Sequence, residues 1–98
     1  MSDPERLAQI FTALGNGIRL ELMSEVAAAS NGESRSVSTL AAALEISRFT
    51  ASHHLAVLRS AHLVDAHRDG LSLRHQVNAS TMTCIEDWYL PFVDTSAR

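Results

Sequence analysis

The sequence predicts a mainly helical fold with one small β-hairpin, and three observations lead to this prediction. Apolar residues recur at intervals of three and four near both ends of the chain and in its middle, as on the buried face of a helix. Residues 62–77 break this pattern and place an Asp-Gly pair between two short apolar stretches, which is typical of a hairpin. With 98 residues, 46% of them hydrophobic, the chain can form one core, so we expect a single domain over 1–98.

The first two helices are predicted from their capping residues. Asp3 followed by Pro4 is a typical helix start, and the helix should run to about Ala13. A break rich in glycine follows, in which Asn16 can cap a second helix. We expect that helix to end within residues 27–30.

A loop and a pair of short helices are predicted next. Residues 30–36 (SNGESRS) are polar and contain a glycine, so we expect a surface loop there. Ser38 can cap a short third helix that ends near Leu44, and Ser47 can cap a fourth that ends near Ser60. Two short helices joined by a tight turn are the arrangement of a helix-turn-helix.

The hairpin and a last helix complete the chain. Two strands within 62–77 are predicted on either side of a type I′ turn at Asp69 and Gly70. Beyond Asn78 the helical spacing returns, and we expect this helix to end at Pro91, because proline cannot donate a helical hydrogen bond.

The order of these elements is that of winged helix-turn-helix proteins that read DNA. The helix-turn-helix would occupy about 38–60, the wing about 62–77, and the N- and C-terminal helices would serve dimerisation. The distribution of charge along the chain agrees with this prediction, although the net charge is −3. Residues 1–45 hold three Arg against six acids, whereas residues 46–76 hold four Arg against two acids, so the predicted DNA-reading segment alone is basic.

The start of the fourth helix carries the candidate DNA-binding residues. Its first turn combines free backbone N–H groups with hydroxyl and guanidinium donors, which suit phosphate oxygens and base edges. A phenylalanine there could contact a thymine methyl group. The residues predicted to bind DNA are Ser47, Arg48, Phe49, Thr50, Ser52 and His53 on the helix and Arg68 and Arg74 on the wing.

Several of these residues also have a purely structural interpretation. Ser47 could act only as an N-cap, and Phe49 could pack against the third helix. Arg68 and Arg74 could be solvated charges of the hairpin. His54 lies nearer the apolar side of the fourth helix, so we interpret it as partly buried and hydrogen-bonded, with no role toward DNA or metal.

Four stretches of the sequence resemble the ArsR family of bacterial repressors. They are residues 11–20 (FTALGNGIRL), residues 36–44 (SVSTLAAAL), residues 47–55 (SRFTASHHL) and residues 58–64 (LRSAHLV), and the resemblance extends over about residues 7–78. His62 stands where the family usually has glycine. The resemblance implies a homodimer joined through its first and last helices. The predicted interface residues are Leu7, Ile10, Phe11, Leu14, Met82, Ile85, Trp88 and Tyr89.

The metal-binding residues found in some members of that family are missing. Where those members place cysteines at the start of the third helix, this chain has Ser36, Ser38 and Ala41, and no histidine follows His75. Cys84 is the only cysteine, and we interpret it as a small core residue. We therefore predict no metal and no cofactor. A site between subunits that uses the other histidines, His62, His67 or His75, is left open.

These observations predict a cytoplasmic DNA-binding transcriptional repressor, homodimeric and bound to an inverted-repeat operator in double-stranded DNA. The alternative is a winged-helix module that docks another protein and binds no DNA. The sequence offers neither a glycine-rich phosphate loop nor a set of nucleophile and base, so we expect no enzymatic activity. No apolar run is long enough for a membrane span. An effector of unknown chemistry remains open as a small-molecule partner.

Overall fold

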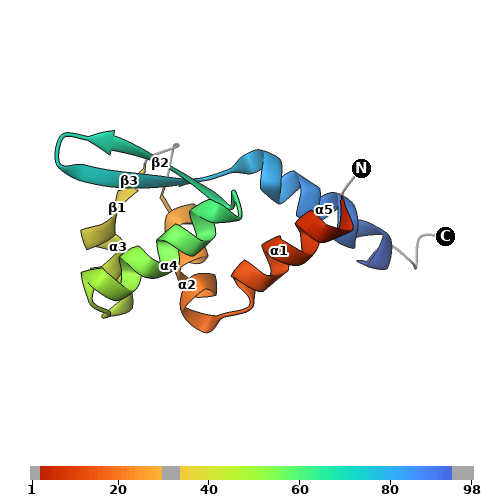
Figure 1. The fold of residues 1–98 in the computed structure, drawn as a ribbon, viewed down its shortest axis with the longest axis horizontal. Coiled ribbons are helices and arrows are strands. Elements are labelled where there is room, and N and C mark those ends of the chain that lie inside the picture. Colours follow the sequence, from red (N-terminus) through yellow and green to blue (C-terminus); the bar gives the residue numbers. More distant parts are fainter. Residues whose placement is uncertain (1–2, 30–33, 94–98) are drawn as a thin grey trace.

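The computed structural model describes residues 3–29 and 34–93, and the predicted helices are present (Figure 1). The first two begin at the expected caps: the Asp3 side chain accepts from the backbone N–H of Glu5, and the Asn16 side chain accepts from that of Arg19. The elements are α1 (Pro4–Leu14), α2 (Gly17–Ala27), β1 (Arg35–Ser36), α3 (Val37–Leu44), α4 (Arg48–Ser60), β2 (Val64–Asp69), β3 (Ser72–Val77) and α5 (Ala79–Val93).

The helix-turn-helix consists of α3 and α4. The expected cap of α4 is confirmed, because the Ser47 hydroxyl accepts from the backbone N–H of Thr50 at 3.0 Å. The expected cap of α3 is wrong by two residues: Ser36, and not Ser38, accepts from the backbone N–H of Thr39. Between the helices, Glu45 adopts a left-handed conformation with φ 56°, which ends α3 and turns the chain sharply into α4.

The wing is part of a three-stranded antiparallel sheet with the strand order β1-β3-β2. We expected two strands, and β1 is the addition. It pairs Arg35 with His75 and Ser36 with Arg74, so the end of the predicted polar loop joins the sheet. Two residues are too few to show the alternating pattern of a strand in the sequence. Residues 30–33 of that loop lie outside the described residues.

The turn of the hairpin differs from the predicted one. Asp69 pairs with Ser72, so the two loop residues are Gly70 and Leu71. Among these, only Gly70 has a positive φ, of 64°. A type I′ turn needs a positive φ at both central residues, whereas a type II′ turn needs it only at the first. The type I′ prediction is therefore wrong, and the glycine takes the first position of the turn.

Helix α5 continues through Pro91 to Val93, so the predicted end at Pro91 is also wrong. The proline lies in the last turn of an exposed helix end, where water can hydrate the carbonyl that its ring leaves without a donor. Although α5 has 15 residues, no helix in the described parts of the chain is long and apolar enough to cross a membrane.

The main core lies under α2, α3, α4 and the sheet, and it extends along α1 toward α5. The molecule is elongated, with extents of 50 × 27 × 22 Å. The hairpin lies at one end and the pair α1 and α5 at the other (Figure 1). The buried core cluster consists of Ile10, Ala13, Leu22, Met23, Val26, Leu40, Leu55, Leu58, Leu63, Val64 and Ile85.

Candidate nucleic-acid interface

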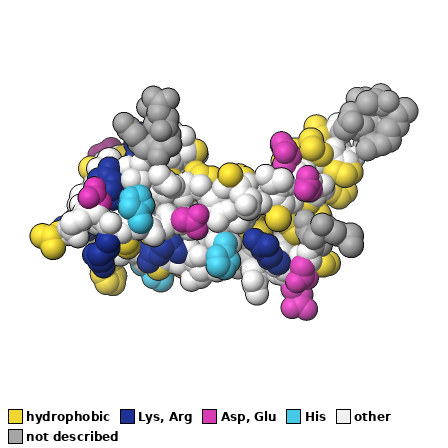
Figure 2. Space-filling model, turned by 90° about the horizontal axis from the view of Figure 1, so that it is seen from above, with side chains coloured by type: hydrophobic (Ala, Val, Ile, Leu, Met, Phe, Trp, Pro, Cys, Tyr) yellow, Lys and Arg dark blue, Asp and Glu magenta, His cyan; other side chains and the backbone are white. Residues whose placement is uncertain are grey.

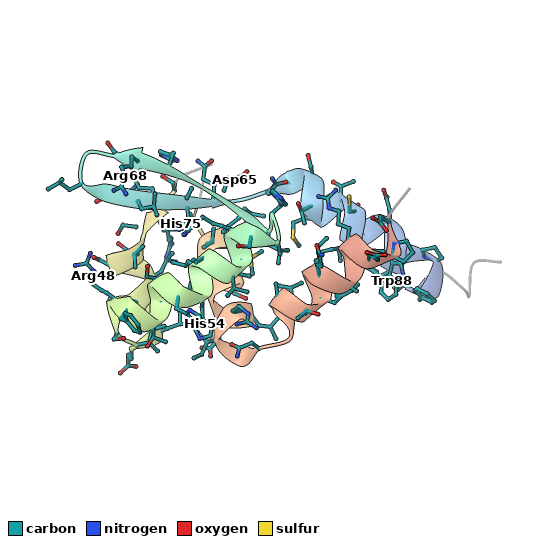
Figure 3. All side chains as sticks on the ribbon, in the orientation of Figure 1. Arg48, His54, Asp65, Arg68, His75 and Trp88 are labelled. Atoms are coloured by element: carbon teal, nitrogen blue, oxygen red, sulfur yellow. The ribbon has the colours of Figure 1, made fainter. Side chains whose placement is uncertain are left out.

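A groove between the start of α4 and the wing brings together several of the predicted DNA-binding residues. Arg48, Phe49 and Ser52 line it from α4, and Arg68 lines it from β2. The labelled Arg48 and Arg68 both lie at the hairpin end of the molecule, opposite Trp88 (Figure 3). The rest of the lining is Ser36, Val37, Ser38, Leu71, Ser72 and Leu73.

The first turn of α4 presents its side chains outward. The Ser47 hydroxyl donates to Thr50 Oγ1 at 2.9 Å while it accepts from the Thr50 backbone, so these two residues hold one another at the helix start. Phe49 is 85% exposed, so the interpretation that it packs against the third helix is wrong. An exposed phenylalanine next to a guanidinium supplies an apolar and a cationic contact in the same turn.

Two arginines of the basic segment are exposed, and two are hydrogen-bonded to other residues of the protein. Arg48 and Arg68 are exposed and make no ion pair with a described residue. Arg59 is engaged inside the protein, because its Nη1 donates to His75 Nε2 at 3.0 Å. Arg74 donates from Nε and Nη2 to the hydroxyl and the carbonyl of Ser34, at 3.1 and 2.6 Å. Arg74 is thus tied to the segment before β1, with only part of its guanidinium facing solvent.

The remaining residue of the predicted DNA-binding set, His53, also lies on the surface. His53 is exposed on α4 and its ring packs edge-on against His54, with centroids 5.2 Å apart. Figure 2 shows that arginine side chains concentrate over the hairpin half of the molecule and are sparse over the opposite half. The structure therefore supplies a cationic groove at one end, while contact of these residues with DNA stays a prediction.

His54 is half-buried and hydrogen-bonded, which confirms its interpretation as a structural residue. Its Nδ1 accepts from Nη1 of Arg19 at 3.1 Å, and the same guanidinium donates from Nε to the carbonyl of Ala13. Burial lowers the pKa of His54, and Arg19 and His53 lower it further. A neutral His54 thus fastens α4 to the junction of α1 and α2.

His75 is fully buried between α4 and the sheet. Because Nε2 accepts from Arg59, Nδ1 carries the proton, and it donates to the carbonyl of Arg35 at 3.4 Å. Burial lowers the pKa of His75. The hydrogen bond to the carbonyl of Arg35 raises this pKa, whereas the positive charges of Arg59 and His67 lower it further. Both ring nitrogens are engaged, so His75 cannot contribute to the metal site that was left open.

The described residues contain no group of three or more His, Cys, Asp or Glu side chains that could hold a metal ion. His62 and His67 are exposed at separate places, in the turn after α4 and on β2. Cys84 is half-buried on α5. A metal site within the described part of a single chain is therefore not supported.

The predicted interface residues fall into two groups. Leu7, Ile10 and Ile85 are buried within the single chain, and Leu14 packs against its core, so these side chains stabilise the protomer itself. The remaining four lie on the surface of α1 and α5: Phe11, Met82, Trp88 and Tyr89.

Two residues of the exposed group, Phe11 and Trp88, are part of an aromatic cluster. Phe11 packs against Trp88, and Trp88 against Phe92, with centroids 5.0 Å apart in each case. Phe92 is itself 65% exposed, and Leu90 and Val93 next to it are exposed as well. So many large apolar side chains on one end of a small chain mark an interaction surface.

Sequence reasoning missed two features of the groove. Leu71 is fully exposed at the tip of the wing and lines the groove, whereas the sequence pattern places it in a strand. An apolar residue directly after Asp-Gly in a predicted turn was the available signal. Ser36 and Ser38 line the groove too, and they could be recognised only once the start of α3 was known.

The fold and this groove define a winged helix-turn-helix protein of the DNA-binding type. The family model of the bacterial regulatory proteins of the arsR family matches residues 16–66. The chain therefore belongs to this family of DNA-binding transcriptional regulators, which is not a family of enzymes. A search of curated proteins found no match.

Solved structures of similar proteins agree with this assignment. The homodimeric winged helix-turn-helix DNA-binding domain of a possible ArsR-family regulator from Mycobacterium bovis is 25% identical, with a TM-score of 0.73 over 97% of this chain and 90% of that one. An ArsR-like transcriptional regulator from Rhodococcus sp. RHA1 is 25% identical, with a TM-score of 0.76 over 90% of this chain and 77% of that one. An ArsR-family regulator with 20% identity shares the fold, with a TM-score of 0.79 over 95% and 92% of the two chains.

Proposed function

We propose that the protein is a homodimeric repressor that binds an inverted-repeat operator and blocks access to a promoter. The observation that carries this proposal is the groove in which Arg48, Phe49 and Ser52 of α4 face Arg68 of the wing. A helix with short polar, apolar and cationic side chains fits the major groove, and the adjacent wing can follow the phosphate backbone or the minor groove.

The proposed dimer uses the surface at the opposite end of the molecule. The exposed side chains of Phe11, Trp88 and Phe92 contact one another on α1 and α5, so a second copy could cover them together. The similar domain from Mycobacterium bovis is described as homodimeric, which supports the same assembly here. Symmetric pairing would present two copies of α4 to successive major grooves, with half-sites about 34 Å apart.

Selection of bound sequences from a random duplex pool tests this proposal. The purified, metal-free protein is incubated with the pool at about 0.15 M salt, because phosphate contacts make affinity depend strongly on ionic strength. We expect enrichment of an inverted repeat whose half-sites are one helical turn apart. Enrichment of a single half-site would contradict the dimer, and no enrichment would favour the protein-docking alternative.

Repression itself needs a second measurement. The selected operator is placed over a promoter, and transcription is followed in a purified system with increasing protein. We expect transcription to fall over the concentration range in which the operator is bound. An increase in transcription would show an activator and contradict the proposed direction of regulation.

A further inference from the structure

A polar pocket lies where α1, the end of α4 and the start of α5 meet, away from the groove that carries the predicted DNA contacts. None of the described residues that line it is acidic. The polar side chains that line the pocket include Arg6, Gln9, Ser60, His62, Ser80 and Thr81.

Arg6 has unused hydrogen-bonding capacity in this pocket. Its Nη2 donates to Thr81 Oγ1 over a long 3.5 Å, and it makes no ion pair with any described residue. A guanidinium carries five N–H donors in a planar fork that matches the oxygens of a carboxylate or a phosphate. Arg6 is therefore placed to bind an anion through several donors at once.

His62 reaches the same pocket from an unfavourable backbone conformation. It follows the end of α4 with φ 59°, a left-handed conformation that disfavours L side chains and suits glycine. Glycine at this position would end the helix equally well and would leave the pocket without an imidazole.

The start of α5 adds to the positive character of the pocket. The partial positive charge of a helix N-terminus favours anions, and the Ser80 hydroxyl lines the pocket at this point. Asn78 connects the pocket to one acidic residue, because its Nδ2 donates to Asp65 at 3.1 and 3.3 Å. Asp65 is not among the residues that line the pocket, but its carboxylate is hydrogen-bonded to one of them, so its charge weakens the attraction for an anion.

We propose that this pocket binds a small anion with at least two acceptor oxygens, a carboxylate or a phosphate, between Arg6, His62 and Ser80. Because Arg6 belongs to α1 and His62 follows α4, the anion would tie the helix of the proposed dimer surface to the helix of the proposed DNA surface. A ligand that favours one relative position of these helices changes DNA affinity by the same factor by which DNA changes ligand affinity. The proposal that the pocket binds an anion does not depend on the proposed function, whereas the coupling to DNA affinity rests on it.

Titration of the free, ¹⁵N-labelled protein followed by NMR tests the binding. Inorganic phosphate and succinate are used as separate probes, with ionic strength held constant by sodium chloride, and the probe that saturates at lower concentration identifies the oxygen chemistry. We expect saturable shifts of the amides of residues 61–62 and 80–81. No saturable shift with either probe would overturn the proposal.

Three variants make this test specific. Arg6→Gln and His62→Gly should each weaken binding at least tenfold, and the glycine variant relieves the backbone, so its loss of binding cannot be due to unfolding. His67→Gln removes an exposed imidazole on β2, outside the pocket, and should bind the anion like the wild type. Equal affinity of Arg6→Gln and the wild type, or equal weakening by His67→Gln, would reduce the effect to unspecific ion binding and overturn the site.

The coupling is tested with the selected operator. Saturating anion should change the operator affinity of the wild type at least threefold and leave that of Arg6→Gln unchanged. An unchanged wild-type affinity would overturn the coupling. Failure to bind any operator would instead contradict the proposed function, and the NMR titration would still decide whether the anion site exists.

Discussion

Two residues end their helices in a conformation that usually belongs to glycine. His62 and Glu45 have φ near +60°, and each helix ends in a Schellman motif. After α4, for example, the N–H of Leu63 donates to the carbonyl of Leu58 and that of His62 to the carbonyl of Arg59. The left-handed backbone at His62 thus explains why the family that the sequence resembles usually has glycine at this position.

Substitution of either residue by glycine should stabilise the protein. The left-handed conformation costs an L residue about 1–2 kcal/mol, and the greater freedom of unfolded glycine offsets part of the gain. We expect His62→Gly and Glu45→Gly each to raise the free energy of unfolding by up to about 1 kcal/mol, measured by urea titration. Ala61→Gly, at a negative φ, is the matched control and should destabilise. A loss of stability in both glycine variants would contradict this account.

Stability should also depend on pH through His75. Its folded-state pKa lies below the ordinary histidine value of 6.5, mainly because of burial, so the folded protein favours the neutral ring. In the unfolded chain the imidazole takes up a proton as pH falls below about 6.5, which stabilises the unfolded state. We expect the contribution of His75 to the free energy of unfolding to be constant above about pH 7 and to fall as the pH drops below about 6.5.

His54 acts in the same direction, because its folded-state pKa is lowered too. Urea titrations at a series of pH values measure the effect, and His75→Gln should flatten it. A free energy of unfolding that rises as pH falls from 6.5 would contradict the neutral assignment of both rings.

Burial was predictable from the sequence for His54 but not for His75. His54 was predicted as partly buried from its angular position on α4, since a long helix defines its buried face well. His75 lies two residues from both Leu73 and Val77, so strand alternation places it on the same face as these two apolar residues. That signal was present, but a polar residue on a buried face becomes interpretable only when its partners, Arg59 and the carbonyl of Arg35, are known.

At the scale of elements, the helices were predictable because each begins with a side-chain cap or a clear change of periodicity. The starts of α1, α2 and α4 follow Asp3, Asn16 and Ser47 as expected. The errors lie where the signal is shorter than a period or where tertiary pairing decides. Strand β1 has two residues, and it exists because β3 offers a free edge to pair with.

The roles of α4 and the wing can be separated by two substitutions in the groove. Phe49→Ala should change which operator sequences are preferred, because Phe49 is exposed at the start of the helix assigned to base contacts. Arg68→Ala should weaken binding to all sequences similarly and lower the slope of log affinity against log salt by about 1, since a wing arginine would contact phosphate. Binding to the selected operator and to scrambled duplexes at several salt concentrations measures both.

A variant at the other wing arginine should differ from this pair. Arg74 is held by Ser34, so Arg74→Ala should lower the stability of the sheet edge in addition to any effect on DNA. If Phe49→Ala and Arg68→Ala affected all sequences equally, the division of labour between α4 and the wing would be wrong.

At the scale of the whole molecule, the two ends differ in what they expose. The hairpin end exposes arginines beside Phe49 and Leu71, and the α1 and α5 end exposes a cluster of aromatic and aliphatic side chains (Figures 2 and 3). The sequence predicted this division, but it could not separate exposed residues from core residues on the same helices. Leu7 and Ile10 share the helical face pattern with Phe11, and only the packed structure shows that the first two are buried.

Trp88→Glu should break the proposed dimer. The exposed part of Trp88 lies between Phe11 and Phe92, so a carboxylate there would have to be buried between subunits without a partner. We expect the dimer dissociation constant to rise at least tenfold, measured by sedimentation equilibrium, and operator affinity to fall with it. Leu20→Glu, at a similarly exposed leucine on α2, should leave both unchanged. A dimeric Trp88→Glu protein would place the interface elsewhere.

The uneven burial along α5 has a consequence for how fast its amides exchange with heavy water. The buried side chains of this helix, Thr81 and Ile85, both lie in its first half, and residues 86–93 are exposed in the single chain. Local opening of that half exposes little new surface, so its free energy should be small in a monomer. If a second copy covers the aromatic cluster, protection of residues 86–93 should grow with protein concentration while that of α4 stays constant. The end of α5 would then complete its folding only upon association.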